Sequence, residues 1–500
     1  MSIVHSLFSC LTDTTFIVIF IVVFLLVVYV RGWWSGGPVP PGPPCYPIVG
    51  SYLSLRGSQN PFAQVAPLAE RYGDVMFLKL FSKPVLVLSG YETIQDALVK
   101  HADLFSDRPE FTANTALSGE KYGKGIVWYN GSTWREIRKF AQQGMREVGV
   151  GKEGVEEKIR EEVTSFITSL SQYKGRPIDF KPLSMKAVNN VICNICFGRR
   201  FEYDDPRMTR ILTLFEELFK PQPLLATLAD LFPWLPVLPP MKKAQDEVFG
   251  RIDKVFEFVK ERISDREETF DADVIRDFVD LYHAKRQDDT HNLCEKNLIC
   301  MIMDLFGAGS ETTSTSLTWH VLYMLHNPDV MTKCQDQIDT VVGRGRPVKL
   351  ADKANLPYVE ATIMEVLRLS NIVLLTLPHA LNKGGEFRGY KFPPGTMVVA
   401  NLKSVHVQKE KWGQPDLFNP QRFLLDDGTV NRKLPLVAFG MGPRMCAGEL
   451  LAKQELFLFF ANLLQRFHFR PATSSQLPSL NGILGLTNSP EPFQVKLVAR

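Results

Sequence analysis

The chain has 500 residues, 45% of them apolar and 22% charged, which excludes bulk disorder and leaves ample apolar mass for a large core. The 57 Lys and Arg residues against 54 Asp and Glu residues give a net charge of +3, so a dedicated nucleic-acid-binding domain, which would be strongly basic, is not expected. The eight cysteines lack a tight, even spacing, which argues against a disulfide-stapled secreted module and favours a reducing compartment.

An apolar run near the N-terminus extends from Phe16 to Val30 without charge, glycine or proline. With its flanking residues it approaches the roughly 20 residues that a membrane-spanning helix needs. A cleaved signal peptide would begin with basic residues and end at a small-residue cleavage site, and residues 1–30 contain no Lys or Arg. We therefore expect an uncleaved membrane anchor over residues 1–35. Because Arg31 is the first positive charge and follows the run, the rest of the chain is expected to face the cytosol.

Proline and glycine crowd residues 36–50, which predicts a stiff, extended hinge between the anchor and the folded body. The body over residues 51–500 is predicted to be rich in α-helix with a minor β part, and its segments interleave, which favours a single catalytic domain. A hairpin is predicted over residues 74–80 and 83–89. The longest predicted helix, over residues 297–326, has no proline and would be about 45 Å long. Other expected elements are helices over 329–342, over 359–369 and after Cys446, and strands over 387–402 around Pro393-Pro394-Gly395 and in the last thirty residues.

Asn130-Gly131-Ser132 forms an acceptor sequence for N-glycosylation, which tests the expected orientation. A cytosolic body is not glycosylated, so we predict that Asn130 is unmodified. A glycan-removing enzyme should then leave the gel mobility of the cell-made protein unchanged. A mobility shift that depends on Asn130 would contradict the predicted topology.

Residues 439–448 combine three glycines with Pro443, Arg444 and Cys446, directly before a predicted helix. Glycines allow a backbone to approach a flat ligand closely. The positive end of the helix dipole and the charge of Arg444 are expected to lower the pKa of the Cys446 thiol, which would make it a nucleophile or a soft metal ligand. The alternative is a buried cysteine that acts as a small hydrophobic residue.

The spacing of Phe439, Gly442, Arg444, Cys446 and Gly448 resembles that of the haem-binding loop of the cytochrome P450 superfamily. The whole chain from Phe16 resembles the animal microsomal type known as clan 2. This resemblance implies the cytochrome P450 fold, mainly α with a minor β part, in which haem b (iron protoporphyrin IX) lies between a long central helix and the cysteine-bearing loop, after an N-terminal transmembrane helix. It implies Cys446 as the thiolate ligand of the haem iron. The other residues implied to bind the cofactor are Phe439, Gly440, Arg444 and Ala308.

The long predicted helix contains the sequence Ala308-Gly309-Ser310-Glu311-Thr312-Thr313. Small residues would let a flat cofactor come close, and Thr312 is placed to donate to the carbonyl of Ala308 four residues earlier. The resemblance implies that Glu311 and Thr312 are catalytic and deliver protons during oxygen activation. The alternative is a helix kink with a polar cap.

Two further motifs match the family. Glu365 and Arg368, three residues apart, share a helix face, and Arg422 lies in the element Pro420-Gln421-Arg422-Phe423. The resemblance implies a buried triad of these three side chains that supports the haem loop and has a structural role, since buried charges need partners. Taken alone, the spacing of Glu365 and Arg368 favours an ordinary surface ion pair.

Trp134 and Arg138 share one helix face and resemble the motif that holds a haem propionate, a role for which the planar guanidinium is suited. Arg108 and His379 match two further propionate contacts of microsomal members. In contrast, Cys193 and Cys196 resemble half of a zinc site, but they have no second pair and are expected to lie in the core.

The apolar, proline-rich segment 211–240 cannot be one regular helix, and the resemblance implies that it roofs the pocket and touches the membrane; a buried helical hairpin is the alternative. Together with residues 111–117, Phe306, 373–377 and 483–486, it indicates an apolar pocket for a lipophilic substrate, whether steroid, fatty acid or xenobiotic.

No nicotinamide or flavin motif is present, so electrons must come from outside the chain. The resemblance implies NADPH-cytochrome P450 reductase as the donor, with cytochrome b5 as a further candidate, at the endoplasmic reticulum membrane. The residues expected to dock the reductase are Arg135, Lys139, Arg146, Arg432 and Lys433. The expected function is that of a haem-thiolate monooxygenase. The alternatives are a haem-containing membrane protein that binds lipids or steroids without turnover, and a reductase-independent isomerase or lyase.

Overall fold

The computed structural model describes residues 15, 17–24, 38–47, 49–55, 64–81, 83–110, 122–219, 229, 235–286, 294–473 and 476–500. The chain folds into two compact units, and each combines two separate stretches of sequence. The first unit contains residues up to Pro109 and Thr376–Asn401, and the second contains Glu110–Leu375 and Leu402–Arg500. The sequence segments interleave as expected, and the single catalytic domain over residues 51–500 stays a prediction.

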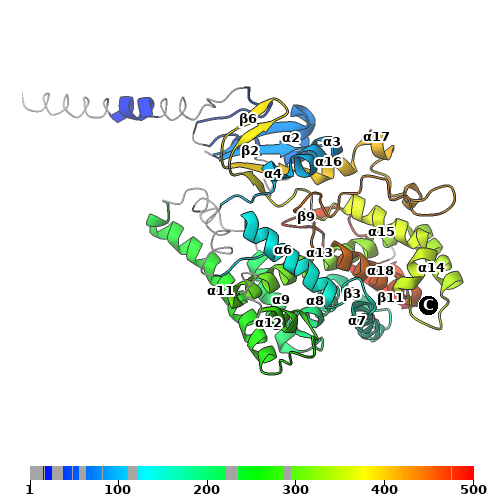
Figure 1. The fold of residues 1–500 in the computed structure, drawn as a ribbon. Coiled ribbons are helices and arrows are strands. Elements are labelled where there is room, and N and C mark those ends of the chain that lie inside the picture. The colour runs from blue at the N-terminus through cyan, green and yellow to red at the C-terminus, as the bar shows by residue number, and fades with distance from the viewer. Residues whose placement is uncertain are drawn as a thin grey trace, which may run out of the picture. The chain divides into compact units, whose positions relative to one another are not determined.

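The first unit is built on a four-stranded sheet with the strand order β1-β2-β7-β4. Figure 1 labels β2 of this sheet. β1 (Val75–Leu80) and β2 (Lys83–Leu88) form the predicted antiparallel hairpin, with Val75 opposite Leu88. β7 (Thr396–Ala400) runs parallel to β2 and is buried along its whole length, since it lies between β2 and β4 (His379–Leu381). A second hairpin pairs β5 (Gly385–Phe387) with β6 (Tyr390–Phe392). The helical segments of this unit are η1 (Tyr52–Leu55), α2 (Val65–Tyr72), α3 (Tyr91–Gln95), η3 (Asp96–Lys100) and α4 (Ala102–Phe105).

The second unit is organised around the long helix α13 (Glu295–His326), which confirms the predicted helix and begins two residues earlier. Its 32 residues give a length of about 48 Å. Most of its own side chains are buried and are apolar or small and polar. They are buried because α13 packs against α8 (Phe180–Phe197), α11 (Pro239–Glu267), α15 (Pro357–Ser370) and α18 (Glu449–Arg466). Pro328 disfavours helical geometry at Asn327, where α13 ends and α14 (Pro328–Val341) begins.

The remaining helices surround this core. In Figure 1, α14, α15 and α18 gather on one side of the second unit, and α9 (Pro206–Phe219), α11 and α12 (Phe278–Arg286) gather on the other. Small sheets complete the unit: β3 (Pro177–Asp179), β11 (Gln494–Ala499) and β8 (Phe467–Pro471) form one, and β9 (Gly482–Leu484) and β10 (Asn488–Pro490) form another. The predicted strands near the C-terminus are thus confirmed. The other helical elements are α6 (Gly131–Glu147), α7 (Glu153–Ser171), α9 (Pro206–Phe219), η4 (Leu235–Val237), α12 (Phe278–Arg286), η5 (Leu350–Asn355), α16 (Leu402–His406), α17 (Lys409–Trp412) and η6 (Pro420–Phe423).

Residue 15 and residues 17–24 are helical and exposed. Within the described parts of the chain, no helix has both the length and the apolar character needed to cross a membrane. Most of the expected anchor and part of the expected hinge, together with residues 111–117, lie outside the described residues.

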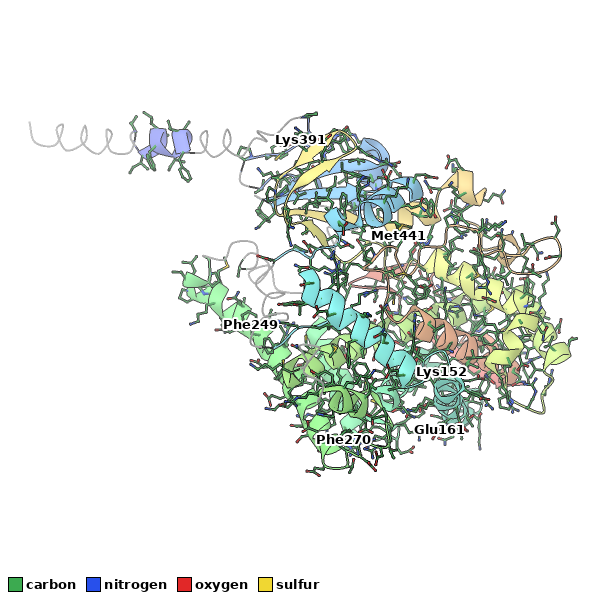
Figure 2. All side chains as sticks on the ribbon, in the orientation of Figure 1. Lys152, Glu161, Phe249, Phe270, Lys391 and Met441 are labelled. Atoms are coloured by element: carbon green, nitrogen blue, oxygen red, sulfur yellow. The ribbon has the colours of Figure 1, made fainter. Side chains whose placement is uncertain are left out.

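The expected pocket roof over residues 211–240 is described at its two ends. α9 reaches Phe219, η4 spans Leu235–Val237, and α11 starts at Pro239; residues 220–228 and 230–234 lie outside the described part. Phe249 lies on α11 and Phe270 lies just beyond its C-terminal end, as Figure 2 shows. Cys193 and Cys196, on α8, are fully buried, which confirms their expected place in the core.

Candidate functional site

The cysteine-bearing loop is a series of tight turns that leads into α18. The N–H of Cys446 donates to the carbonyl of Phe439 at 2.9 Å, and the N–H of Met445 donates to the carbonyl of Gly442 at 3.0 Å. Gly440 and Gly442 have φ angles of 73° and 78°, which side chains rarely tolerate, so glycine is required at both turns. Met441, labelled in Figure 2, lies between these two glycines.

The thiol of Cys446 has a raised pKa, which corrects the expectation of a lowered one. Its side chain keeps accessible surface, but protein atoms crowd around the sulfur, and the loss of hydration is the largest effect. The N–H of Gly448 at the start of α18 lowers the pKa, as a helix N-terminus should, and the charge of Glu449 opposes it. A bound metal ion would deprotonate such a thiol despite this raised pKa.

The sequence predicts that Arg444 supplies the positive charge next to Cys446. In the structure this charge comes from Arg138 instead. The Arg138 side chain is only 9% exposed, and its Nη2 donates to the carbonyl of Met445. Arg444 instead lies over the ring of Trp134, with 3.4 Å between the guanidinium carbon and the ring centroid. Its Nη2 donates to the carbonyl of Tyr129 at 2.7 Å.

Trp134 and Arg138 lie on one face of α6, as predicted, with the Arg138 guanidinium carbon 5.9 Å from the Trp134 ring centroid. The indole N–H of Trp134 donates to the carbonyl of Ile126 at 2.9 Å. The structure thus brings Trp134, Arg138 and Arg444 together beside the loop that carries Cys446. Asn130, the acceptor residue of the glycosylation sequence, is held here too, because its Oδ1 accepts from Arg444 Nη2 at 3.1 Å.

Arg108 and His379 belong to the first unit and lie next to one another there. Arg108 Nη1 donates to the carbonyls of Leu377 and Pro378, at 2.9 Å each. His379 Nδ1 lies 2.6 Å from the carbonyl oxygen of Phe105. Both side chains are at least 95% buried, so each is fixed in place by its own unit.

On α13, Ala308 is exposed and Thr312 partly exposed, although most of the helix is buried. The hydroxyl of Thr312 donates to the carbonyl of Ala308 at 2.7 Å, as predicted. The sequence interpretation of Gly309 is wrong, however. A Cβ at this position would lie 2.9 Å from Cδ1 of Ile192, so glycine here lets α8 pack against α13 and does not make room for a cofactor.

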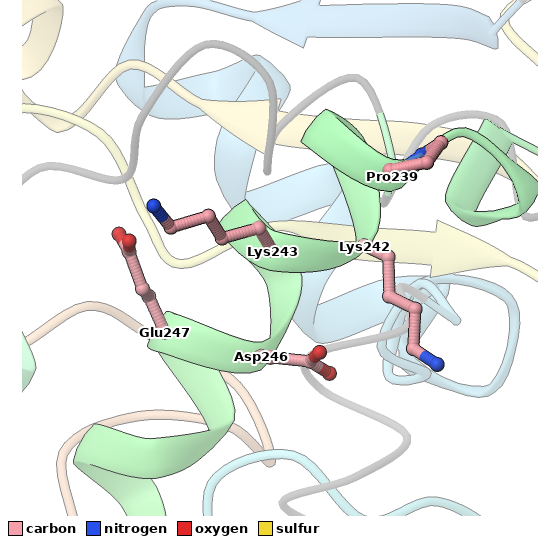
Figure 3. A pocket seen from close by; sticks show the side chains of 5 residues that line it. All are labelled: Pro239, Lys242, Lys243, Asp246 and Glu247. Carbon is pink, nitrogen blue, oxygen red and sulfur yellow. The ribbon is translucent and has the colours of Figure 1, made fainter.

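Phe306, which the sequence places in an apolar pocket, is completely buried. Its ring stacks on Phe215, with 5.8 Å between the centroids, and also contacts Phe197. An open hollow of about 430 Å³ lies instead over the first turns of α11, lined by Pro239, Lys242, Lys243, Asp246 and Glu247, as Figure 3 shows. This surface hollow contains none of the predicted catalytic or haem-binding residues, although Pro239 belongs to the predicted pocket roof.

The buried triad is confirmed. Arg368 forms two hydrogen bonds with Glu365, at 2.7 and 2.8 Å, and both side chains are fully buried. Arg422 Nε donates to Glu365 Oε1 at 3.0 Å. The guanidinium of Arg368 also donates to the backbone carbonyls of His406 and Pro415, so its charge is well compensated.

The route from the triad to the cysteine loop passes through His406, which the sequence did not single out. Arg368 Nη1 donates to the His406 carbonyl at 2.9 Å, and the N–H of Val437 donates to His406 Nε2 at 3.0 Å. The Val437 carbonyl accepts from the N–H of Gly440 at 2.9 Å. Burial, reinforced by the charge of Arg368, lowers the pKa of His406 to about 3. The imidazole therefore stays neutral and keeps its acceptor for Val437.

Taken together, the second unit presents a cysteine on a glycine-rich loop, guanidinium groups at that loop, and small side chains on the central helix, of which Ala308 is exposed. This donor set fits an iron porphyrin, because a thiol suits the iron and guanidinium groups suit carboxylates. In the described part of the chain, no cluster of three or more His, Cys, Asp or Glu residues offers an alternative metal site.

The comparison with known proteins decides the family. The model of the family described as "Cytochrome P450" matches residues 40–497. The chain belongs to the cytochrome P450 family. Cytochrome P450 2U1 from Rattus norvegicus is 37% identical over 499 residues, with 93% of this chain and 91% of the relative covered. Cytochrome P450 2C39 from Mus musculus is 35% identical, covering 97% and 99%, and cytochrome P450 2D3 from Rattus norvegicus is 35% identical, covering 95% and 96%.

These relatives establish an animal microsomal P450 of clan 2, a haem-thiolate monooxygenase that uses haem b. The mainly helical fold with its minor β part is the P450 fold. The resemblance stated from the motifs is therefore confirmed at the level of family, enzyme class and cofactor.

Asp304 is a site residue that the sequence did not reveal. It lies on α13, one turn before Ala308, and its Oδ2 accepts from the N–H groups of Ile126 and Val127 at 2.6 and 3.0 Å. The carbonyl of Ile126 in turn accepts from Trp134. Asp304 thus ties the segment that leads into α6 to the central helix, and a Cβ at Gly125 would collide with its carboxylate at 2.4 Å.

Asp304 is predicted to make stability depend on pH. Protein atoms surround its carboxylate, and the loss of hydration raises its pKa to about 6. Because the folded protein then holds a proton more tightly than the unfolded chain does, stability is highest below about pH 4 for this group and falls as the pH rises to about 6. The loss is on the order of 2–3 kcal/mol.

Asp304→Asn keeps an oxygen acceptor but does not titrate, so it is the matched control. Denaturant unfolding from pH 4 to 7 should show the wild type losing stability relative to Asp304→Asn as the pH rises. A difference between the two proteins that is independent of pH would show that Asp304 is not the titrating group.

Proposed function

We propose that this P450 inserts one oxygen atom of O₂ into a lipophilic small molecule, with electrons delivered from NADPH by a membrane-bound reductase. The other oxygen atom leaves as water, and the two electrons and two protons that this requires come from the reductase and from solvent. The observation that carries the proposal is Cys446 on its tightly turned loop, together with Arg444 of that loop and Arg138 beside it.

In this proposal Cys446 would hold the haem iron, and Phe439, Gly440 and Ala308 would help to bind the cofactor. Haem, when bound, supplies the reduction of O₂, and the thiolate favours O–O cleavage. Arg444, Trp134, Arg138, Arg108 and His379 would bind the propionates. Trp134 and Arg444 would exchange some of their present contacts with backbone carbonyls for contacts with the propionates.

Proton delivery is assigned to Thr312 and Glu311. The Thr312 hydroxyl lies on an accessible part of α13 and is oriented by its hydrogen bond to Ala308. A side chain that both donates and accepts hydrogen bonds can pass a proton on. Glu311, the next residue, is 27% exposed and can exchange protons with water.

Exposed apolar side chains support a lipophilic substrate and a membrane location. Ile483 and Leu486, at the β9–β10 hairpin, are 55% and 58% exposed, and Val237, just before α11, is 85% exposed. Ile483 and Leu486 belong to the same hairpin, and large apolar side chains grouped at a surface mark ligand or membrane contacts. We propose that a steroid, fatty acid or xenobiotic enters from the endoplasmic reticulum membrane, to which residues 1–35 anchor a cytosolic catalytic body through the hinge at 36–50.

The reductase is proposed to dock on five exposed cations, with cytochrome b5 as a second candidate partner. Arg135, Lys139 and Arg146 fall on one face of α6, since their spacings of four and seven residues bring them into line. Arg432 and Lys433 are also exposed. Their positive charge would attract an acidic partner, and salt would screen that attraction.

Reversing the charge at Arg135 and Lys139 together should slow reductase-driven reduction at least about tenfold at low salt, and less at high salt. The measurement is the stopped-flow rate of reduction by NADPH and reductase. Lys260→Glu, an exposed lysine on α11, is the matched control and should leave the rate unchanged. Equal rates in all three proteins would place the docking surface elsewhere.

The deciding experiment reconstitutes the full chain with reductase, NADPH and ¹⁸O₂ and screens lipophilic compounds. A product with one ¹⁸O atom, formed with consumption of NADPH, supports the proposal. Turnover that needs neither NADPH nor O₂ would identify an isomerase or lyase. Binding without turnover across the screen, with intact haem, would identify a binding protein.

A further inference from the structure

The carboxylate of Glu311, on α13, is held by donors from three different segments. Its Oε1 lies 2.9 Å from Lys181 Nζ, 3.1 Å from the hydroxyl of Thr315 and 3.4 Å from the hydroxyl of Thr487. Thr315 is one turn further along α13, so its contact is local, whereas Lys181 and Thr487 come from elsewhere in the second unit. The only charged group among these donors is Lys181.

Lys181 is fixed near the start of α8. Asp179 caps this helix, with its Oδ1 accepting from the N–H of Lys181 at 3.2 Å. The Lys181 ammonium group also donates to the hydroxyl of Ser489 on β10 at 2.7 Å. One ammonium group thus joins the carboxylate on the central helix to the β9–β10 hairpin.

The hairpin is itself firmly anchored, so Ser489 can serve as a fixed support. Beside it, the N–H of Asn488 donates to the Ile372 carbonyl at 2.7 Å, and its side-chain amide donates to the Ser370 carbonyl at 2.8 Å. The Asn488 carbonyl accepts from the indole of Trp319, on α13, at 2.8 Å. The backbone next to Ser489 is therefore tied both to α13 and to the end of α15.

We propose that Lys181 is a positioning residue that holds Glu311 in place for proton delivery, and that Ser489 supports it from the hairpin. This inference rests on the proposed role of Glu311. The Lys181 and Glu311 side chains are 29% and 27% exposed, so water reaches the pair. An ion pair with this exposure is weak enough to open and close. The carboxyl group gives one proton inward and regains one from water, so no further reactant is needed.

The amino-acid sequence alone does not suggest this role for Lys181, because 130 residues separate it from Glu311. Lys186, also on α8, donates to the Tyr203 carbonyl at 2.6 Å and makes no contact with Glu311. The substitution Lys186→Met therefore removes a lysine from α8 but leaves the contacts of Lys181 with Glu311 and Ser489 intact.

The test compares Lys181→Met, Lys181→Arg, Ser489→Ala, Glu311→Gln and the control Lys186→Met, each first shown to give a normal reduced-CO spectrum. For Lys181→Met we expect the product formed per NADPH to fall at least about threefold, hydrogen peroxide release to rise and the solvent deuterium isotope effect to change. Ser489→Ala should give a smaller change in the same direction. Lys181→Arg should restore the wild-type values, and Lys186→Met should match them.

A second readout does not depend on turnover. In the crystal structure of Lys181→Met, the Glu311 carboxylate should leave its place beside Thr487; an unchanged carboxylate position would overturn the inference. Product yield per NADPH equal to that of Lys186→Met would overturn it as well. If Glu311→Gln changes the yield and Lys181→Met does not, only this inference fails. If Glu311→Gln itself changes nothing, the proposed role of Glu311 fails.

Discussion

Cys446→Ser is expected to abolish the strongly red-shifted Soret band of the reduced, CO-bound protein and, with it, monooxygenase turnover. Serine has nearly the same shape, so the loop should still form through the N–H of Cys446 and the carbonyl of Phe439. What is lost is the soft thiolate ligand, which favours O–O cleavage. The measurement is the CO difference spectrum of the membrane-expressed protein, run beside the wild type.

Cys294→Ser is the matched control for this experiment. Cys294 is also free and exposed, but it lies at the N-terminus of α13, where serine is a favourable capping residue. The CO difference spectrum of Cys294→Ser should match that of the wild type. A red-shifted band that survives in Cys446→Ser would remove Cys446 as the iron ligand and reopen the choice of ligand among the other cysteines.

Arg368→Met is expected to lower the free energy of unfolding by about 3–5 kcal/mol. The substitution leaves Glu365 as a buried charge with Arg422 alone to balance it, and it strips donors from the carbonyls of His406 and Pro415. Because His406 also accepts from Val437, haem retention should suffer together with stability. Denaturant unfolding followed by circular dichroism measures the first effect, and haem content measures the second.

Arg344→Met provides the comparison for the triad. Arg344 pairs with Asp339 at 2.8 Å but is 54% exposed, and an exposed ion pair contributes little to stability because water screens it. Its loss should barely change the unfolding midpoint. Similar losses in Arg344→Met and Arg368→Met would contradict the view that the buried triad stabilises the fold.

Features that depend on neighbouring residues could be predicted from the sequence. The hydrogen bond from Thr312 to Ala308, the shared face of Trp134 and Arg138, and the extent of α13 all follow from helix geometry. The buried triad needed the family resemblance as well, because Arg422 is more than fifty residues from its partner Glu365.

Features that depend on distant neighbours could not be predicted. Asp304 accepts from backbone groups about 180 residues away, and a backbone N–H has no signature in the sequence. The need for glycine at position 309 comes from Ile192 on another helix. The pKa of Cys446 was misjudged because the helix dipole can be inferred from sequence, whereas the crowding that dehydrates the sulfur cannot.

The parallel pairing of β2 with β7 has a consequence for synthesis on the ribosome. Val85 of β2 pairs with Met397 of β7, about 310 residues later, and ribosomes add about 5–20 residues per second. The β1–β2 hairpin therefore emerges about 15–60 seconds before its partner strand exists. During that time the apolar edge of Val85–Leu88 is open to pairing with other chains, so the nascent protein is most prone to aggregation before β7 has been synthesised.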